Sequence, residues 1–192
     1  MRGVFIIFST YVFIYDTFAQ FEVVLANYIL KHKGEVITFG IDDEKVTSSE
    51  EFITVPHKSI DELDVDDIDL LVIPGGDPSQ VNEKEKLYSL IKEVNKKDKL
   101  IGAICAAPVH LAKASILNNI KFTTTLDINS IDEFNEDNFI DNNVVIDENI
   151  ITAKASGYVD FAIELGKQVE VFEDENDLNE TIRFFKYFNE EK

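Results

Sequence analysis

Short runs of apolar residues alternate along the chain with stretches whose apolar residues recur every three or four positions. Short continuous runs are typical of strands buried on both faces, and the three-to-four spacing is typical of helices. Strands are predicted at residues 4–8, 36–39, 52–55, 69–73, 100–104, 120–123, 144–146 and 150–153. Helices are predicted at residues 18–33, 83–95, 108–114, 158–172 and 178–188. This alternation predicts an α/β fold with a mostly parallel sheet and with reactive groups at the carboxyl ends of its strands.

The first and last predicted helices each contain several large apolar side chains. In the first helix, Gly34 is placed to end the helix, and the apolar stripe is formed by Phe21, Val24, Leu25, Tyr28 and Ile29. The last helix contains Phe184, Phe185 and Phe188. For these phenylalanines, packing on the core of the same chain is the default expectation, and a second subunit is the alternative.

Composition narrows the range of partners. The 192 residues fit a single domain over residues 1–192, and 18 Lys and Arg against 37 Asp and Glu give a net charge of −19. Nucleic acids and anionic membrane surfaces attract clusters of basic side chains, so the charge argues against both partners. No apolar run reaches the roughly 18 residues of a membrane span. A cytoplasmic protein is therefore expected.

The N-terminal apolar stretch argues against a signal peptide, and the single cysteine argues against disulfides and cysteine-based zinc sites. Residues 4–15 favour a buried strand over a signal peptide, because Ser9 and Thr10 interrupt the stretch and no clear cleavage site follows. One cysteine cannot form an internal disulfide, nor can it build a zinc site that needs several cysteines. No metal or cofactor is expected.

The most informative segment runs from residue 100 to residue 108 and reads LIGAICAAP. A buried strand ends on Cys105, small residues follow, and a helix begins, which is the layout of a nucleophile elbow. A thiol at a helix N-terminus is expected to have a lowered pKa, because the helix dipole and nearby N–H groups stabilise the thiolate. The alternative is that Cys105 is a small buried apolar residue.

A second turn with possible chemistry follows the neighbouring strand, at Pro74, Gly75 and Gly76. Glycines allow a sharp turn that exposes backbone N–H groups, and such groups could stabilise an oxyanion formed at Cys105. The alternative is an ordinary turn at the end of a strand.

Together with these two turns, a third motif at residues 151–157 (ITAKASG) makes the chain resemble the DJ-1/PfpI (ThiJ) superfamily. The resemblance implies a flavodoxin-like three-layer sandwich, often a homodimer, with a reactive cysteine at the elbow. It also implies a carboxylic acid on the first helix that is hydrogen-bonded to the cysteine, and the matching residue is Glu22. Burial of Glu22 would favour its protonated form, which can donate a hydrogen bond to a thiolate.

The chain departs from this family where many members carry a histidine. Ala106 follows the cysteine directly, and Thr125 occupies the position of the later histidine. His32 is expected at a helix end and His57 in an exposed loop, whereas His110 lies five residues past Cys105 and points away from it. A Cys-His protease, a glutamine amidotransferase and a serine hydrolase are therefore disfavoured.

Three functions remain open on these grounds. The first is a glyoxalase or deglycase acting on small electrophilic carbonyl compounds through Cys105 and Glu22, with Gly75, Gly76 and Ala106 as oxyanion donors and Thr125 in the pocket. The second is redox sensing in a stress response, by oxidation of Cys105. The third is a regulatory domain that binds a small ligand.

Overall fold

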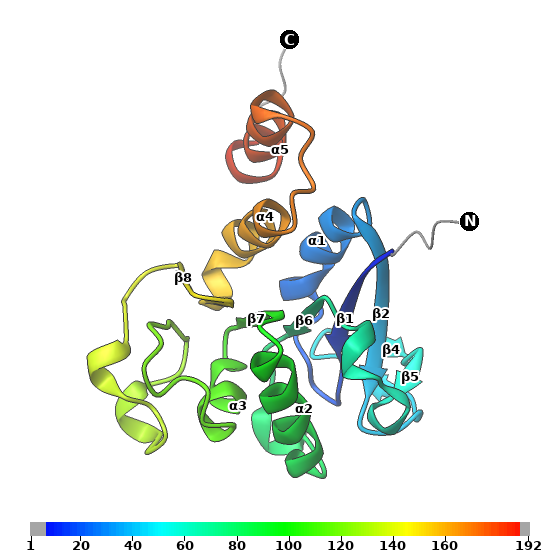
Figure 1. Cartoon of the computed structure of the whole chain (residues 1–192), viewed down its shortest axis with the longest axis vertical. Helices are drawn as coiled ribbons and strands as arrows, with labels where there is room; N and C mark the ends of the chain where they lie inside the picture. The colour runs from blue at the N-terminus through cyan, green and yellow to red at the C-terminus, as the bar shows by residue number, and fades with distance from the viewer. Residues whose placement is uncertain (1–6, 189–192) are drawn as a thin grey trace.

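The computed structural model describes residues 7–188, and within them it contains a seven-stranded sheet flanked by helices (Figure 1). The strands of the sheet are β1 (Phe8–Phe13), β2 (Gly34–Gly40), β5 (Lys58–Ser59), β6 (Leu70–Ile73), β7 (Leu100–Ile104), β8 (Val144–Asp147) and β9 (Ile150–Ala153). Their order is β5-β2-β1-β6-β7-β9-β8, and only β8 and β9 pair antiparallel. The central order is that of flavodoxin-like doubly wound sheets, which confirms the predicted fold class.

Helices cover both faces of the sheet and give three layers (Figure 1). One face carries α1 (Phe21–Leu30) and α4 (Tyr158–Gln168), and the other carries α2 (Lys84–Lys96) and α3 (Pro108–Lys113). A further helix, α5 (Glu175–Tyr187), is stacked on the outside of α4. Among residues 7–188, no helix is long and apolar enough to cross a bilayer.

Smaller elements complete the described chain. A separate hairpin is formed by β3 (Val46–Thr47) and β4 (Ile53–Thr54). Short 3-10 turns lie at Ile60–Glu62, Val65–Asp67, Pro78–Gln80, Ile128–Ser130, Glu136–Asn138 and Ala155–Gly157.

Strand β6 shows why the buried strands read as continuous apolar runs. Leu71 and Ile73 contribute to the core beneath α2 and α3, whereas Leu70 and Val72 contribute to the core beneath α1 and α4. All four side chains are fully buried. Because successive side chains of a strand point to opposite faces, a strand covered on both faces needs apolar residues at every position.

The first predicted strand is wrong in position. Residues 4–6 lie outside the described part of the chain, Ile7 is 56% exposed, and β1 begins only at Phe8. Ser9 and Thr10, which interrupt the apolar stretch, lie inside the strand, and Thr10 is fully buried. The segment at 120–123 is likewise not a strand, since it forms only an isolated bridge between Phe122 and Phe139.

The first helix is shorter than predicted and buries a different face. It ends at Leu30, and Gly34 begins β2 opposite Phe8 instead of ending the helix. Three members of the predicted stripe are about half exposed, namely Phe21, Val24 and Tyr28. The buried face is formed by Glu22, Val23, Leu25, Ala26, Ile29 and Leu30. Because α1 is apolar on nearly all sides, spacing alone could not identify the face that packs on the sheet.

Candidate active site

The carboxyl ends of β1, β6, β7 and β9 meet at one edge of the sheet and bring the predicted site residues together. Cys105 follows β7, Gly75 lies two residues past β6, and Glu22 is in the first turn of α1, which follows β1. In open parallel sheets, sites form where connections leave the strand ends in opposite directions. Here that point lies between β1 and β6, next to β7.

Cys105 has a backbone conformation that an ordinary residue rarely adopts. Its φ angle is +63°, in the left-handed region, and such a residue persists only where its surroundings hold it. Its N–H donates to the Ala153 carbonyl at 2.8 Å, and its carbonyl accepts from the Thr125 N–H at 3.0 Å and the Thr124 hydroxyl at 2.8 Å. The elbow predicted from sequence is therefore present and is fixed by bonds from two other segments.

Glu22 reaches the cysteine from α1. The side chain is 1% exposed and is hydrogen-bonded to Cys105, and its Oε2 accepts the Gly75 N–H at 2.8 Å. A carboxyl oxygen that accepts a backbone N–H in a buried site is fixed in orientation. The contact predicted by the family resemblance is thus formed in this chain.

The pKa values of Glu22 and Cys105 depend on each other. Burial raises the pKa of Glu22, and the hydrogen bonds from Cys105 and the Gly75 N–H oppose that rise. Beside an ionised Glu22, burial and then the carboxylate charge raise the pKa of the Cys105 thiol to about 11. Two buried acids in contact titrate as a pair, so a thiolate forms most easily when Glu22 keeps the proton.

The lowered thiol pKa expected from the helix dipole needs correction. Helix α3 begins only at Pro108 and has six residues, so its N-terminus is three residues away from Cys105. The groups that lower the pKa of the thiol are instead the Thr125 hydroxyl and the N–H of Ala106. They are outweighed by burial and by the negative charge of Glu22.

Position 75 must be glycine because Cys105 and Glu22 both lie against it. A Cβ atom at this position would lie 2.5 Å from Cys105 Cβ, 2.7 Å from Glu22 Oε2 and 2.9 Å from Cys105 Sγ. All three distances are shorter than real Cβ contacts allow. Only glycine therefore lets the segment after β6 pass beside the cysteine and the carboxyl group.

Three backbone N–H groups were predicted as oxyanion donors, and the prediction is wrong for Gly75, because its N–H already donates to Glu22. Within the described chain, the Gly76 N–H has no hydrogen-bond partner. The Ala106 N–H faces the sulfur of Cys105. Gly76 therefore keeps an unpaired N–H within the described chain, and the N–H of Ala106 points at the sulfur.

Thr125, which the family resemblance matches to the missing histidine, contacts the sulfur of Cys105. Its hydroxyl is hydrogen-bonded to Cys105 and also accepts the Ala155 N–H at 2.9 Å. Because this contact lowers the pKa of the Cys105 thiol, the hydroxyl acts as a donor to the sulfur. Thr125 orients and stabilises the sulfur, but it has no basic group with which to take up a proton.

None of the three histidines is in contact with this site. His32 packs edge-on against Tyr28, and the exposed His57 ring bonds to Thr38. His110 is 1% exposed, lies 6.0 Å from the Tyr88 ring between centroids, and has no hydrogen-bond partner on either ring nitrogen among the described residues. The prediction that His110 points away from the thiol agrees with these neighbours.

One site residue was missed from the sequence. Tyr15 follows β1 and donates from its hydroxyl to the Gly75 carbonyl at 2.9 Å. A tyrosine at the end of an apolar run is indistinguishable in sequence from a core residue. Among residues 7–188, no group of three or more His, Cys, Asp or Glu side chains could hold a metal ion.

Comparison with known proteins identifies the family of this chain. The family model described as DJ-1/PfpI family matches residues 9–168. The chain belongs to the DJ-1/PfpI family. It is 30% identical over 165 residues to "Glutathione-independent glyoxalase DJR-1.2" of Caenorhabditis elegans, covering 83% of this chain and 87% of that protein. It is 29% identical over 144 residues to "Deglycase TK1284" of Thermococcus kodakarensis, with coverages of 74% and 87%.

Two further matches complete the comparison. "Uncharacterized protein MJ0967" of Methanocaldococcus jannaschii is 39% identical over 123 residues, which span 62% of this chain and only 60% of that protein. Among solved structures, the DJ-1 superfamily protein Atu0886 of Agrobacterium tumefaciens superposes with a TM-score of 0.85 at 27% identity, over 95% of this chain and 100% of that one.

Proposed function

We propose that this protein converts small electrophilic carbonyl compounds in the manner of a glyoxalase or deglycase, with Cys105 as the nucleophile and Glu22 as the proton carrier. The observation that carries the proposal is the buried contact of Cys105, the only cysteine, with Glu22 at the carboxyl edge of the sheet. Relatives named deglycase and glyoxalase favour this chemistry over redox sensing or ligand binding. A reducing cytoplasmic location would keep the single thiol reduced.

Methylglyoxal illustrates the reaction. The ionised sulfur of Cys105 attacks the aldehyde carbon, a C–S bond forms, and the carbonyl π electrons move to the oxygen. The N–H groups of Gly76 and Ala106 stabilise that oxyanion, and the proton held by Glu22 neutralises it to give a hemithioacetal.

The second half of the reaction uses the carboxylate that this step leaves behind. Glu22 removes the proton from the former aldehyde carbon and returns it to the adjacent carbon, while the hydroxyl proton passes between the two oxygens. The product is a lactoyl thioester of Cys105. Water hydrolyses this thioester: its oxygen completes the lactate carboxylate, one of its protons returns to Glu22, and the other is released. Methylglyoxal plus water thus gives lactate and a proton and regenerates the free site.

The test measures consumption of methylglyoxal and release of lactate by the purified chain. Cys105→Ser is expected to abolish turnover, and Glu22→Ala to reduce it by at least ~100-fold, the scale of a lost general acid–base. Glu35→Ala is the matched control, because Glu35 is an exposed glutamate. Turnover that survives Cys105→Ser would overturn the proposal.

The other two functions are distinct outcomes of the same experiment. A chain without turnover whose thiolate is oxidised by peroxide to a sulfinic acid would indicate redox sensing. A thiol that resists both the carbonyl compound and peroxide would leave only ligand binding. Because the chain has one cysteine, mass spectrometry of the thiol reports on Cys105 alone.

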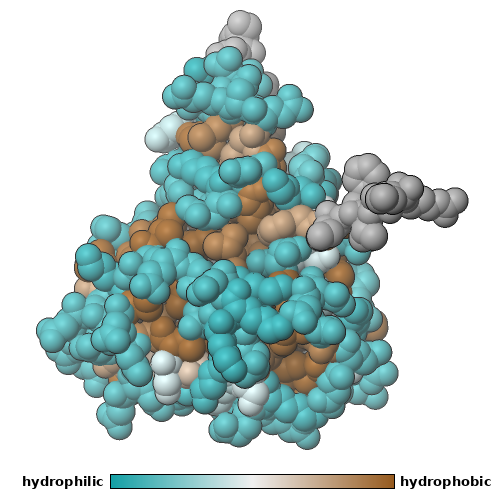
Figure 2. Space-filling view, viewed as in Figure 1, coloured by the Kyte–Doolittle hydropathy of each residue, from teal (hydrophilic) through white to brown (hydrophobic). Residues whose placement is uncertain are grey.

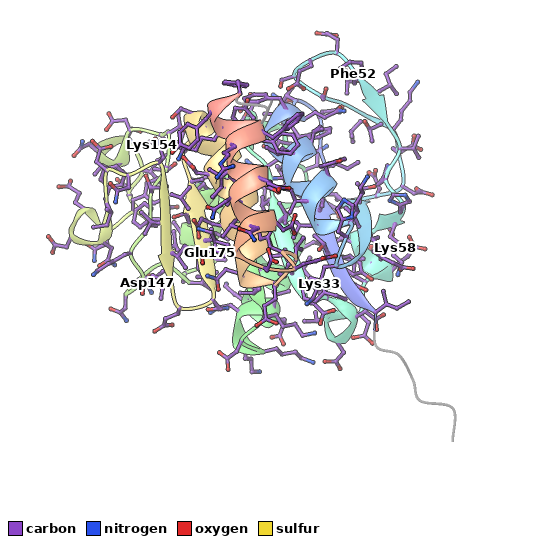
Figure 3. All side chains as sticks on the ribbon, turned by 90° about the horizontal axis from the view of Figure 1, so that it is seen from above. Lys33, Phe52, Lys58, Asp147, Lys154 and Glu175 are labelled. Atoms are coloured by element: carbon purple, nitrogen blue, oxygen red, sulfur yellow. The ribbon has the colours of Figure 1, made fainter. Side chains whose placement is uncertain are left out.

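We also propose that two copies of the chain associate through the outer face of α1 and α5. Helix α5 has no buried residue in this structure, and Phe184 and Phe188 are 53% and 85% exposed. Core packing was therefore the wrong expectation for these two phenylalanines, and only Phe185 is partly buried. Figure 3 shows α5 lying over α4, and the Phe185 ring of α5 contacts the Tyr28 ring of α1. Figure 2 shows apolar side chains between the α5 layer and the helices beneath it.

The exposed area is of the size that an interface needs. An apolar groove of about 710 Å³ runs along this face and is lined by Phe21, Val24, Tyr28, Phe52, Phe184 and Phe188, among others. These side chains are each 46–85% exposed. At 150–250 Å² for a large aromatic side chain, they leave roughly 600 Å² of apolar surface. A stable interface buries about 800 Å² per partner, including its polar rim.

The oligomeric state tests this second proposal. Sedimentation velocity at micromolar concentration is expected to find a dimer for the unaltered chain and a monomer for Phe184→Glu. Ile146→Glu is the matched control, because Ile146 is 40% exposed on the edge strand β8, away from this groove. A monomeric unaltered chain, or a dimer that survives Phe184→Glu, would contradict the proposal.

A further inference from the structure

The hydroxyl group of Tyr15 lies beside the catalytic pair but takes no part in the proton transfers proposed for it. Tyr15 is 4% exposed, and its ring stacks on Phe13 with a centroid distance of 5.3 Å and an interplanar angle of 21°. Its hydroxyl donates to the Gly75 carbonyl at 2.9 Å in a buried environment. Core packing thus holds the ring in place and aims its hydroxyl at one carbonyl group.

That carbonyl group is held from a second direction. The N–H of Ala19 donates to the same Gly75 oxygen at 3.0 Å. The following residue, Gly76, has a φ angle of +129°, and a Cβ there would lie 2.3 Å from the Thr17 oxygen and 2.9 Å from the Tyr15 hydroxyl. The segment after β1 therefore packs closely against Gly75 and Gly76.

The Gly75 carbonyl and the Gly76 N–H belong to one peptide group. Hydrogen bonds accepted by the oxygen fix the plane of the group and draw electron density from its nitrogen, which makes the N–H a stronger donor. Within residues 7–188, the Gly76 N–H has no hydrogen-bond partner.

We propose that Tyr15 is a positioning residue for the oxyanion site: its hydroxyl orients and polarises the Gly75–Gly76 peptide, so that the Gly76 N–H stabilises the oxyanion formed at Cys105. This inference rests on the proposed use of Gly76 as an oxyanion donor. Burial raises the pKa of Tyr15, and the charges of Glu22, Cys105 and Asp77 act in the same direction, which keeps the hydroxyl protonated as a donor.

The test compares two reactions of the same sulfur. p-Nitrophenyl acetate acylates a thiolate through a tetrahedral oxyanion: the C–S bond forms, the carbonyl electrons move to oxygen and return, and p-nitrophenolate leaves. Iodoacetamide alkylates the same thiolate by displacing iodide at a saturated carbon, so no oxyanion forms. The ratio of the two rates cancels changes in thiolate concentration and isolates oxyanion stabilisation.

Tyr15→Phe is expected to lower this ratio by about 3- to 10-fold, the effect of one neutral hydrogen bond. Tyr11→Phe is the matched control, because Tyr11 lies in β1, is 2% exposed and packs against Phe39 in the core. Its ratio is expected to stay unchanged. The amide proton resonance of Gly76 is expected to move upfield in Tyr15→Phe only, as the N–H loses polarisation.

An unchanged ratio in Tyr15→Phe would overturn the inference, and so would an equal fall in Tyr11→Phe, which would indicate a general packing effect. The outcome is independent of turnover. A chain that acylates but does not consume methylglyoxal would refute the proposed function and still report on Tyr15.

Discussion

His110 is buried and has no hydrogen-bond partner among residues 7–188, and its burial makes the stability of the protein depend on pH in a calculable way. Burial lowers the pKa of His110 from the ordinary value of 6.5 to about 4, and the charges of Lys84 and Lys113 act in the same direction. The unfolded chain therefore binds a proton at His110 below about pH 6.5, and the folded chain resists doing so until about pH 4. The stability that His110 contributes is complete above pH 6.5 and is lost as the pH falls towards 4.

The magnitude follows from the size of the shift. A shift from 6.5 to about 4 corresponds to about 3 kcal/mol in total. Linkage places about 2 kcal/mol of that loss between pH 7.5 and pH 5. The free energy of unfolding should fall by this amount over that interval, in addition to the contributions of all other titrating groups.

Urea denaturation at the two pH values measures the effect when the unaltered chain is compared with His110→Leu. The other titrating groups are common to both chains, so the difference between their pH dependences isolates His110. We expect the unaltered chain to lose about 2 kcal/mol more than the variant between pH 7.5 and pH 5. Equal losses in the two chains would refute the reasoning that His110 is neutral and desolvated in the folded state.

Three further substitutions test individual contacts. Gly75→Ala should cost about 1–3 kcal/mol of stability, measured by urea denaturation, and should alter the rate at which iodoacetamide alkylates Cys105. The control Gly102→Ala should leave that rate unchanged, because the atoms nearest to a Cβ at Gly102 belong to the side chains of Leu165 and Phe161. Thr125→Val should raise the pKa of the Cys105 thiol, because the hydroxyl lowers it, as read from the pH dependence of alkylation. Glu50→Ala should cost about 1 kcal/mol in urea denaturation, because its carboxylate accepts the N–H groups that begin α1.

The sequence was sufficient for the elbow and its partner acid. A strand ending on Cys105 and followed by small residues predicts a sharp turn, and the resemblance led to Glu22 on the first helix. Both residues lie in contact in the structure. The elbow could be predicted because it is a local motif of consecutive residues, whereas Glu22 was found through the family resemblance.

The electrostatics of the site were harder to predict. The expected lowering of the thiol pKa relied on a helix N-terminus, but α3 is short and begins three residues later. The role of Gly75 was also mistaken, because its N–H binds Glu22 instead of an oxyanion. Both depend on how separate segments approach each other in space, which spacing along one segment does not encode.

Apolar segments were ambiguous for a different reason. The N-terminal run extends beyond the strand it forms, so periodicity could not place β1 at Phe8–Phe13. Helix α1 is apolar on nearly all sides, and only packing shows that the face with Glu22 is the buried one. Tyr15 was overlooked because its hydroxyl finds its partner, Gly75, 60 residues further along the chain.

The proposed chemistry requires that Cys105 and Glu22 share a proton and that Glu22 holds it when the sulfur is ionised. A single pH titration tests this by following the ultraviolet absorbance of the thiolate and the infrared stretch of the protonated carboxyl group. The Glu22 band is the one missing in Glu22→Gln, and the thiolate absorbance is the one missing in Cys105→Ser. We expect the thiolate to appear while Glu22 is still protonated. If the Glu22 band disappears first and the thiolate emerges only near the pKa of about 11 set by burial and an ionised Glu22, the claim is wrong.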